Sequence, residues 1–232
     1  LVPVAQEFGV SPAHVQISRS DATSAIDVLY SITGTATPGT DFLISAASPV
    51  HFEAGESIKT LTIYPLSDSD AEGEETIDIT LTPNAAYTLG AATTANVTLR
   101  DRPSDAWKVV HFPADPNGVD LLGDTDLDGN KELAEFGLLM NPNVPDSNGL
   151  PTAGLTADGN YPTLTYTRPE DADVSYLVQM STNLLMWYSG AGYTEEIARV
   201  HNGDGTLTVT LRSVMSLSTA PAQQMRLRIQ RF

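Results

Sequence analysis

The 232-residue sequence contains no cysteine and few basic residues. The absence of cysteine excludes disulfides, thiolate zinc sites and cysteine nucleophiles. Its 12 lysines and arginines are outnumbered by 29 aspartates and glutamates, giving a formal net charge of −17. This balance argues against nucleic-acid binding and against a polybasic membrane anchor, since both need clustered basic residues. No apolar run approaches the ~20 residues of a membrane-spanning helix.

Motifs for catalysis are also missing. The four histidines lie in separate segments, and none has the spacing of a helical metal-ligand pair. There is no Gly-x-Ser-x-Gly motif, no phosphate-binding glycine loop and no dinucleotide fingerprint. A glycosidase-like pair of carboxylates stays open, because such a pair forms in space rather than in sequence. We therefore expect that the protein is not an enzyme.

What the chain does contain is a period-two alternation of apolar and polar residues, bounded by glycine, proline, aspartate and asparagine. Clear examples are residues 28–32, 77–81, 207–211 and 225–229. This alternation is typical of half-buried strands, and many short strands with frequent turns indicate β-sandwiches or barrels. The sequence therefore predicts an all-β chain.

One helix and one linker interrupt the strands. A helix is predicted over residues 131–140, where Leu133, Phe136 and Met140 fall on one face. Residues 100–105 are polar and contain a proline, so we interpret them as a linker. This division predicts a first domain over residues 1–103.

Four blocks of the first module follow one another in a recognisable order: residues 34–42, 50–60, 68–76 and 89–101. In content and spacing they resemble the signature of Calx-beta domains over essentially the whole module. The resemblance implies a seven-stranded, immunoglobulin-like sandwich with calcium sites clustered at one end. The positions that match the family's ligands are Asp41, Asp68, Glu72, Glu75 and Asp101.

The first module departs from the family pattern in two places. Residues 8–11 lead into Pro12 where the family's first strand offers a glutamate. Asp101 is followed by Arg102 and Pro103 rather than by further aspartates, and arginine cannot bind a cation. These departures favour fewer ions than a full site holds. The alternative interpretation is that the acids are solvated loop residues.

Residues 124–135 match the calcium loop of EF-hands. Such a loop needs oxygens at positions 1, 3 and 5, a backbone carbonyl at 7, water or a side chain at 9 and a bidentate carboxylate at 12. Those positions hold Asp124, Asp126, Asp128, Asn130, Glu132 and Glu135. Gly129 stands at position 6, where the loop turns sharply. The sequence therefore predicts a Ca²⁺ site, and Mg²⁺ fits less well because it demands tighter octahedral geometry.

The segment before this loop, residues 116–120, cannot form the entering helix of a paired EF-hand. The loop therefore resembles the single calcium loops of dockerins and thrombospondin-type repeats. The predicted fold is two immunoglobulin-like β-sandwich domains joined by a short linker, with one short helix after the calcium loop. The linker with its loop and helix spans residues 104–145, and the second sandwich spans residues 146–232.

The C-terminal module resembles the β domains at the ends of large secreted proteins of Verrucomicrobia-type bacteria. Two of its features have alternative interpretations. Trp187 and Tyr188 follow an alternating strand, so they either pack in the core or offer a platform for a sugar. Arg226, Arg228 and Arg231 either form an anion patch or guard an exposed edge strand.

These observations lead to one functional hypothesis with an alternative. We expect a non-catalytic, extracellular calcium-binding structural or adhesion protein, secreted or on a bacterial cell surface. One role within that class is a self-assembling filament subunit, in which residues 1–7, which have no obvious place in the sandwich, pair with a neighbouring copy. The alternative is a carbohydrate- or substrate-binding accessory region of a large secreted hydrolase. The chain opens at Leu1 without a basic leader, so we expect a processed or truncated chain.

Overall fold

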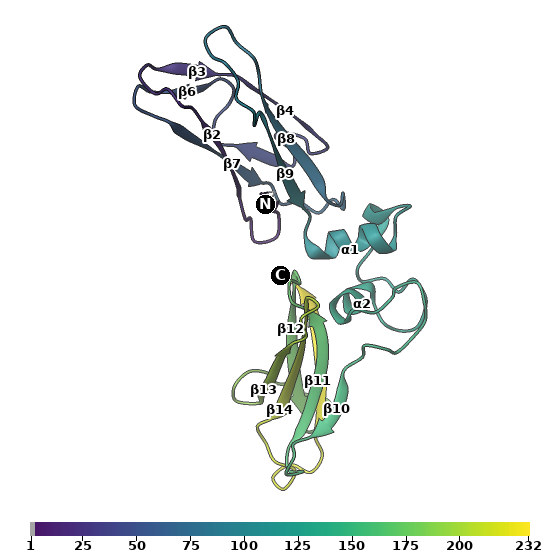
Figure 1. Ribbon diagram of the computed structural model, residues 1–232. Coiled ribbons are helices and arrows are strands. Elements are labelled where there is room, and N and C mark those ends of the chain that lie inside the picture. The colour runs from purple at the N-terminus through teal and green to yellow at the C-terminus, as the bar shows by residue number, and fades with distance from the viewer. Residues whose placement is uncertain (1–2) are drawn as a thin grey trace. The chain divides into compact units, whose positions relative to one another are not determined.

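The computed structural model describes residues 3–232, and the chain separates into two compact units, residues 1–110 and residues 111–232 (Figure 1). The predicted all-β class is confirmed, because both units consist mainly of strands. The first unit holds β1 (Val4–Gln6), β2 (Ala13–Ser18), β3 (Ile26–Val28), β4 (Tyr30–Gly34), β5 (Phe42–Ile44), β6 (Val50–Phe52), β7 (Ile58–Pro65), β8 (Glu75–Leu81) and β9 (Thr94–Arg100).

The strands of the first unit form a sandwich around one core. One sheet has the order β1-β9-β8-β4, another has the order β2-β7-β5, and β3 pairs with β6. In β8, Ile77 and Ile79 are buried and alternate with more exposed residues, as the pattern over residues 77–81 predicts. The core is filled by side chains that are almost completely buried, among them Phe42, Phe52, Ile63, Ile77 and Leu99.

Strand β1 corrects the prediction that the N-terminal segment lies outside the sandwich. Val4, Ala5 and Gln6 pair in parallel with Thr98, Leu99 and Arg100 of β9. Ala5 is fully buried in the core. The pairing was missed because it joins residues more than ninety positions apart, which no local pattern reports. The first two residues of that segment lie outside the described part of the chain.

A second correction concerns the predicted linker at residues 100–105. Helix α1 (Pro103–His111) begins inside it, with Pro103 at the first helical position, where a missing N–H costs nothing. Its buried side chains are Ser104, Asp105 and Lys108. Because that face is polar, the helix gives no apolar periodicity in the sequence.

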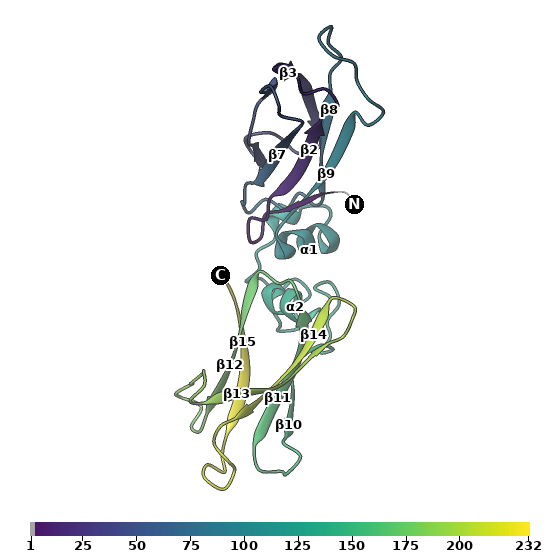
Figure 2. The ribbon, with the colours of Figure 1, turned by 60° about the vertical axis from the view of Figure 1, so that its left-hand side comes forward.

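The second unit contains two further sheets that enclose a smaller core (Figure 2). Its elements are η1 (Pro116–Gly118), α2 (Glu132–Leu138), β10 (Thr152–Leu155), β11 (Pro162–Pro169), β12 (Val174–Ser181), β13 (Thr194–His201), β14 (Thr206–Ser213) and β15 (Gln224–Arg231). One sheet has the order β10-β11-β14-β13, and β12 pairs with β15 alone. The predicted helix after the loop is present as α2, which is shorter than the ten residues expected.

Helix α2 packs directly against the second unit's sheets. The hydroxyl of Tyr176 donates to the Gly137 carbonyl at 2.9 Å. A Cβ at Gly137 would lie 2.9 Å from the Ile229 side chain, so glycine permits this close approach of α2 and β15. Leu138 and Met140 join the core of this unit. The helix that leaves the 124–135 loop is therefore anchored in the sandwich.

None of the helices among residues 3–232 is long and apolar enough to cross a membrane.

Candidate metal centres

The first acidic cluster lies in the first unit, where three chain segments meet. Asp41 comes directly before β5, Glu72 lies in the connection from β7 to β8, and Glu75 is the first residue of β8. These three residues offer carboxylate oxygens that all lie within 4.8 Å of one another. Asp41 is 2% exposed and Glu75 is 9% exposed.

Asp101, which follows β9, holds the β7–β8 connection in place. One oxygen of its buried carboxylate accepts hydrogen bonds from the backbone N–H groups of Glu72 at 3.0 Å and of Gly73 at 2.7 Å. The negative charge of Asp68 adds to burial in raising the pKa values of both Glu72 and Asp101. The structure thus brings the five predicted residues of this module into one electrostatic neighbourhood.

Glu7 belongs to the same cluster and was missed by sequence reasoning. It follows β1, its backbone N–H donates to the Arg100 carbonyl at 3.0 Å, and its side chain is 3% exposed. Burial first, and then the charges of Asp101 and Asp68, raise the pKa of Glu7 to about 8. Residues 8–11 offer no glutamate, and the carboxylate of this cluster comes from Glu7, directly before them. Residues 4–6 carry no alternating pattern that would have marked a strand there.

The electrostatics of the cluster are unfavourable without a cation. Burial first, followed by the charges of Asp41 and Glu72, raises the pKa of Glu75 to about 7. Burial is also the largest cause that raises the pKa values of Glu72 and Asp101. The ammonium group of Lys108 forms an ion pair with Asp105 at 2.7 Å, so its positive charge is balanced by Asp105. Several buried carboxylates of one sign fit a bound cation.

The second candidate centre is the 124–135 loop. Gly129 has φ of +95°, and its backbone N–H donates to Asp124 at 3.0 Å. The backbone N–H of Asp128 donates to Asp126 at 3.2 Å, and that of Asn130 donates to Asp128 at 2.7 Å. These bonds wrap the backbone around the carboxylates. Asp124, Asp126 and Asp128 offer oxygens within 4.8 Å of one another.

The loop encloses carboxylate oxygens that have no donor. Five buried oxygens lack a hydrogen-bond partner: Asp124 Oδ1, Asp126 Oδ2, Glu132 Oε2 and both oxygens of Glu135. Glu132 and Glu135 are each 1% exposed. Burial first, and then the charges of Asp126 and Asp128, raises the pKa of Glu135 to about 7. Buried oxygens of this kind are costly unless a proton or a cation satisfies them.

The remaining loop residues occupy places consistent with the EF-hand positions. The amide nitrogen of Asn130 donates to Asp128 at 3.1 Å. At position 7 the EF-hand pattern uses the backbone carbonyl. The Thr125 hydroxyl donates to one oxygen of Glu132. Before the loop, the structure has only the three-residue η1 rather than an entering helix. The backbone N–H of Leu133 donates to the Leu121 carbonyl at 2.9 Å, which ties this segment to α2.

The other residues singled out in the sequence do not gather into a site. His14, His51 and His201 bond Thr62, Asp27 and Glu170 respectively, each at an exposed position. Trp187 is half-buried rather than in the core, and the Arg226 guanidinium lies 4.1 Å from the centre of its ring.

Comparisons with known proteins give structural likenesses only. The crystal structure of the apo form of the Calx CBD1 domain is 25% identical, with a TM-score of 0.36, and the match covers 43% of this chain and 88% of that one. The calcium-binding domain CBD12 of CALX1.1 is 17% identical, with a TM-score of 0.45 and coverage of 92% and 73%. CBD12 from CALX1.2 is 16% identical, with a TM-score of 0.42 and coverage of 91% and 72%. No family model and no curated protein matches the chain.

Proposed function

We propose that this is a non-catalytic, calcium-binding structural protein in which bound ions fix loops of its two β units. The observation that carries the proposal is the set of five buried, unpartnered carboxylate oxygens in the 124–135 loop. A bound Ca²⁺ ion would satisfy these oxygens together. Position by position, the loop offers six oxygen ligands from Asp124, Asp126, Asp128, Asn130, Glu132 and Glu135.

The donor set selects the class of metal. All of these ligands are hard oxygens, and histidine and cysteine are absent from the loop. Zinc and copper prefer nitrogen or sulfur ligands, whereas calcium takes six to eight oxygens in flexible geometry. The first acidic cluster offers the same chemistry through Glu7, Asp41, Glu72, Glu75 and Asp101, with Asp68 beside them. We assign calcium to both centres.

The expected role is mechanical support of loops rather than signalling. Neighbouring loops that carry several carboxylates repel one another until a cation neutralises them. An ion that binds only the folded form adds stability as RT ln(1 + [Ca²⁺]/Kd). We propose that the protein acts outside the cell, on a bacterial surface or secreted, where other calcium-binding modules have Kd values of about 10⁻⁴ to 10⁻³ M.

Calorimetric titration of the full chain with calcium tests the loop assignment. The Asp124→Asn, Glu135→Gln double variant should lose one ion per chain and the associated rise in melting temperature. Asp171→Asn is a matched control, because Asp171 is an exposed acid of the same unit. The proposal fails if the parent binds no calcium at about millimolar concentration, or if the double variant binds as many ions as the control.

The first acidic cluster is tested in the same titration by Glu75→Gln. Any ions that remain in the loop variant should fall in number with this substitution. An unchanged number would remove calcium from this cluster, while leaving the loop assignment intact.

Adhesion is the role within this class that we favour. Assembly through a donated N-terminal segment loses its basis, because Val4 to Gln6 already pair with β9 of their own unit.

Carbohydrate binding by an accessory region is the second candidate, favoured by an exposed apolar loop. Leu184, Leu185 and Met186 are 59%, 83% and 55% exposed, and Trp187 follows them. Saturable glycan binding that is lost in Trp187→Ala would support this role, and equal binding by both proteins would refute it.

A further inference from the structure

One side of strand β15 has no strand paired with it in the part of the chain that the structure describes. Its other side pairs in unbroken antiparallel register with β12, from Gln224 opposite Ser181 to Arg231 opposite Val174. In an antiparallel strand, alternate residues direct both backbone groups to the same side, so a row of N–H and C=O groups on β15 points away from β12.

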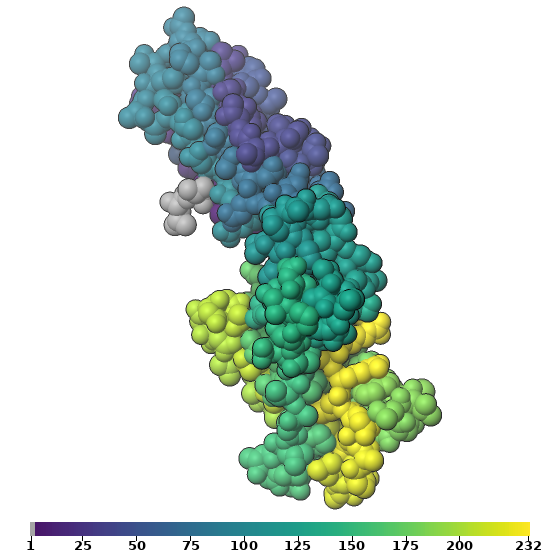
Figure 3. All heavy atoms as spheres, turned by 90° about the vertical axis from the view of Figure 1, so that its right-hand side faces the viewer, coloured from purple at the N-terminus to yellow at the C-terminus, as the bar shows by residue number. Residues whose placement is uncertain are grey.

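The other edge strands of this unit are less open to pairing. Strand β13 carries a bulge between Glu196 and Ala198, and β10 has only four residues. The outer edge of β12 is partly occupied, because the backbones of Met180 and Tyr188 exchange two hydrogen bonds there. Bulges and short length are both devices that protect sheet edges from pairing. Strand β15 is eight residues long and regular, and it has neither device. Figure 3 shows β15, in yellow, at the surface of the second unit.

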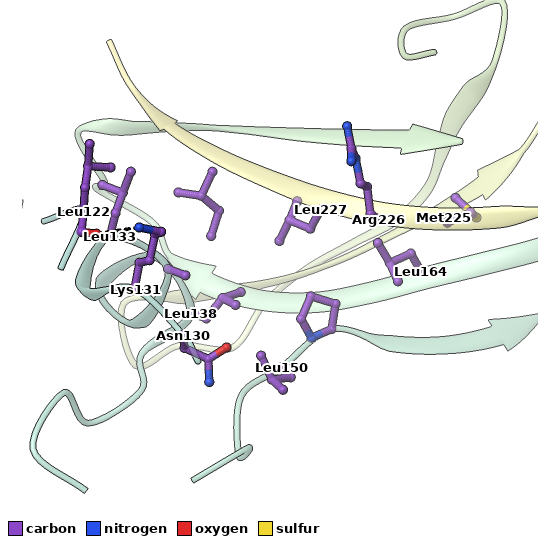
Figure 4. Close-up of a pocket in the computed structure, with 13 residues that line it drawn as sticks. Leu122, Asn130, Lys131, Leu133, Leu138, Leu150, Leu164, Met225, Arg226 and Leu227 are labelled. Carbon is purple, nitrogen blue, oxygen red and sulfur yellow. Dashed lines mark hydrogen bonds between the residues drawn. The ribbon is translucent and has the colours of Figure 1, made fainter. Parts of the chain in front are cut away.

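An apolar cavity of about 460 Å³ lies along this open edge. Its lining comes from β15, from α2, from β11, from the segment before β10, and from Leu122, Asn130 and Lys131 before α2 (Figure 4). The residues that give it apolar character include Leu138, Leu150, Leu164, Met225, Leu227 and Ile229. Leu150 is 39% exposed, so the cavity wall reaches the surface. A strand added beside β15 would direct every second side chain into this space.

The opposite face of β15 is cationic. Arg226 and Arg228 lie on this face and are exposed, whereas Met225, Leu227 and Ile229 are partly buried against the core. Arg231 stands opposite the buried Val174 and therefore belongs to the apolar side of the strand. Strands β12 and β15 contain no acidic residue. Arg226 is held by its bond to Gln179 at 2.9 Å and by the Trp187 ring. Among the described residues, Arg228 has no ion-pair partner. In a chain of net charge −17, this surface is a local concentration of positive charge.

We propose that the open edge of β15 accepts an extended strand of a partner protein, in which apolar residues alternate with acidic ones. The main chain of that strand would bond the outward N–H and C=O groups of β15. Its apolar side chains would fill the cavity, and its carboxylates would lie beside Arg226 and Arg228. Opposite charges on neighbouring strands favour pairing, which selects an acidic partner over a basic one.

The first test uses two synthetic peptides and the full chain in excess calcium. One capped octapeptide alternates valine with aspartate, and the other alternates valine with lysine. The aspartate peptide should bind about tenfold more tightly or better, and its affinity should fall as salt is added. It should also slow the hydrogen exchange of alternate backbone amides of β15. Equal binding of both peptides, protection confined to β13 or to the first unit, or no binding would overturn the proposal.

Variants separate the charge from the cavity. Arg228→Glu leaves this face with one cation and one anion, so the preference for the aspartate peptide should be lost. Arg199→Glu on β13 is the control, and the preference should not change. Leu150→Glu places a charge in the cavity from an exposed position and should weaken the aspartate peptide by about tenfold or more. If the chain alone forms oligomers that Leu150→Glu dissociates, the occupant is a second copy and the proposed partner is wrong.

Discussion

Glu135→Gln is expected to have opposite effects on the calcium-free and the calcium-bound protein. In the absence of calcium, both oxygens of Glu135 are buried without a donor. Glutamine keeps nearly the same shape but carries no charge, so it removes a source of repulsion from Asp126 and Asp128. With calcium present, the same change removes the bidentate ligand at the last loop position. The variant should therefore be more stable than the parent without calcium and less stabilised by adding it.

The magnitude follows from the raised pKa of Glu135. Its pKa rises from an ordinary 4.5 to about 7 in the folded protein. Each pKa unit corresponds to about 1.4 kcal/mol, so ionisation of Glu135 costs the calcium-free fold up to about 3 kcal/mol. The folded protein holds the proton of Glu135 more tightly than the unfolded chain does. The calcium-free fold therefore keeps its full stability below about pH 4.5 and loses up to this amount as the pH rises through about 7. Calcium at 100 times its Kd would restore about 2.7 kcal/mol.

Fluorescence-monitored urea unfolding can measure the effect in the second unit alone. The chain has two tryptophans, Trp107 in α1 and Trp187 in the second unit. In a Trp107→Phe background, the remaining emission reports on the second unit. Protein freed of metal on a chelating resin should lose stability between about pH 5 and about pH 8, and Glu135→Gln should flatten that loss. Asp171→Asn is the control for removing one negative charge.

One result would refute the reasoning. If calcium-free Glu135→Gln is less stable than the parent at about pH 8, then Glu135 makes favourable contacts as a carboxylate and the oxygens are not repulsive.

Three further predictions concern the first unit. Glu7→Gln should stabilise the calcium-free unit above about pH 8, because the pKa of Glu7 is raised to about 8 and glutamine avoids the buried charge. The fluorescence of Trp107 during urea unfolding would measure this gain. A destabilised variant would contradict the view that the acidic cluster is repulsive without calcium. Phe42→Ala should lower the free energy of unfolding by about 3–5 kcal/mol in the same measurement, since Phe42 is completely buried. A loss below about 1 kcal/mol would mean that the core collapses into the space that the phenyl ring leaves. Gly34→Ala should cost about 1–3 kcal/mol or more, because φ is +131° and a Cβ there would collide with the Thr76 carbonyl; wild-type stability would show that β4 shifts freely against β8.

Local patterns in the sequence predict much of the fold and the loop. Alternation identifies β8, β14 and β15, because each has one face on a core and one towards solvent. The 124–135 loop could be predicted because all of its candidate ligands lie within twelve consecutive residues. Its geometry is decided by local turns, such as that at Gly129.

The features that were missed depend on distant parts of the chain. Glu7 joins the first acidic cluster only because β1 pairs with β9, so its role is set by a non-local contact. Helix α1 buries Asp105 and Lys108 as an ion pair, which replaces the apolar face that sequence analysis looks for. The open edge of β15 is defined by the lack of a neighbouring strand, and a strand's own residues do not encode what pairs with it.

The parallel pairing of β1 with β9 also decides how the first unit would respond to a stretching force. Val4 to Gln6 run in the same direction as Thr98 to Arg100, and the chain leaves the pair at opposite ends. Tension applied at the two ends of this unit would slide one strand along the other, loading all of their hydrogen bonds at once instead of peeling them apart in turn. Glu7 and Asp101 come directly after these two strands. An ion bound by both side chains would link the ends of the two strands and oppose their sliding.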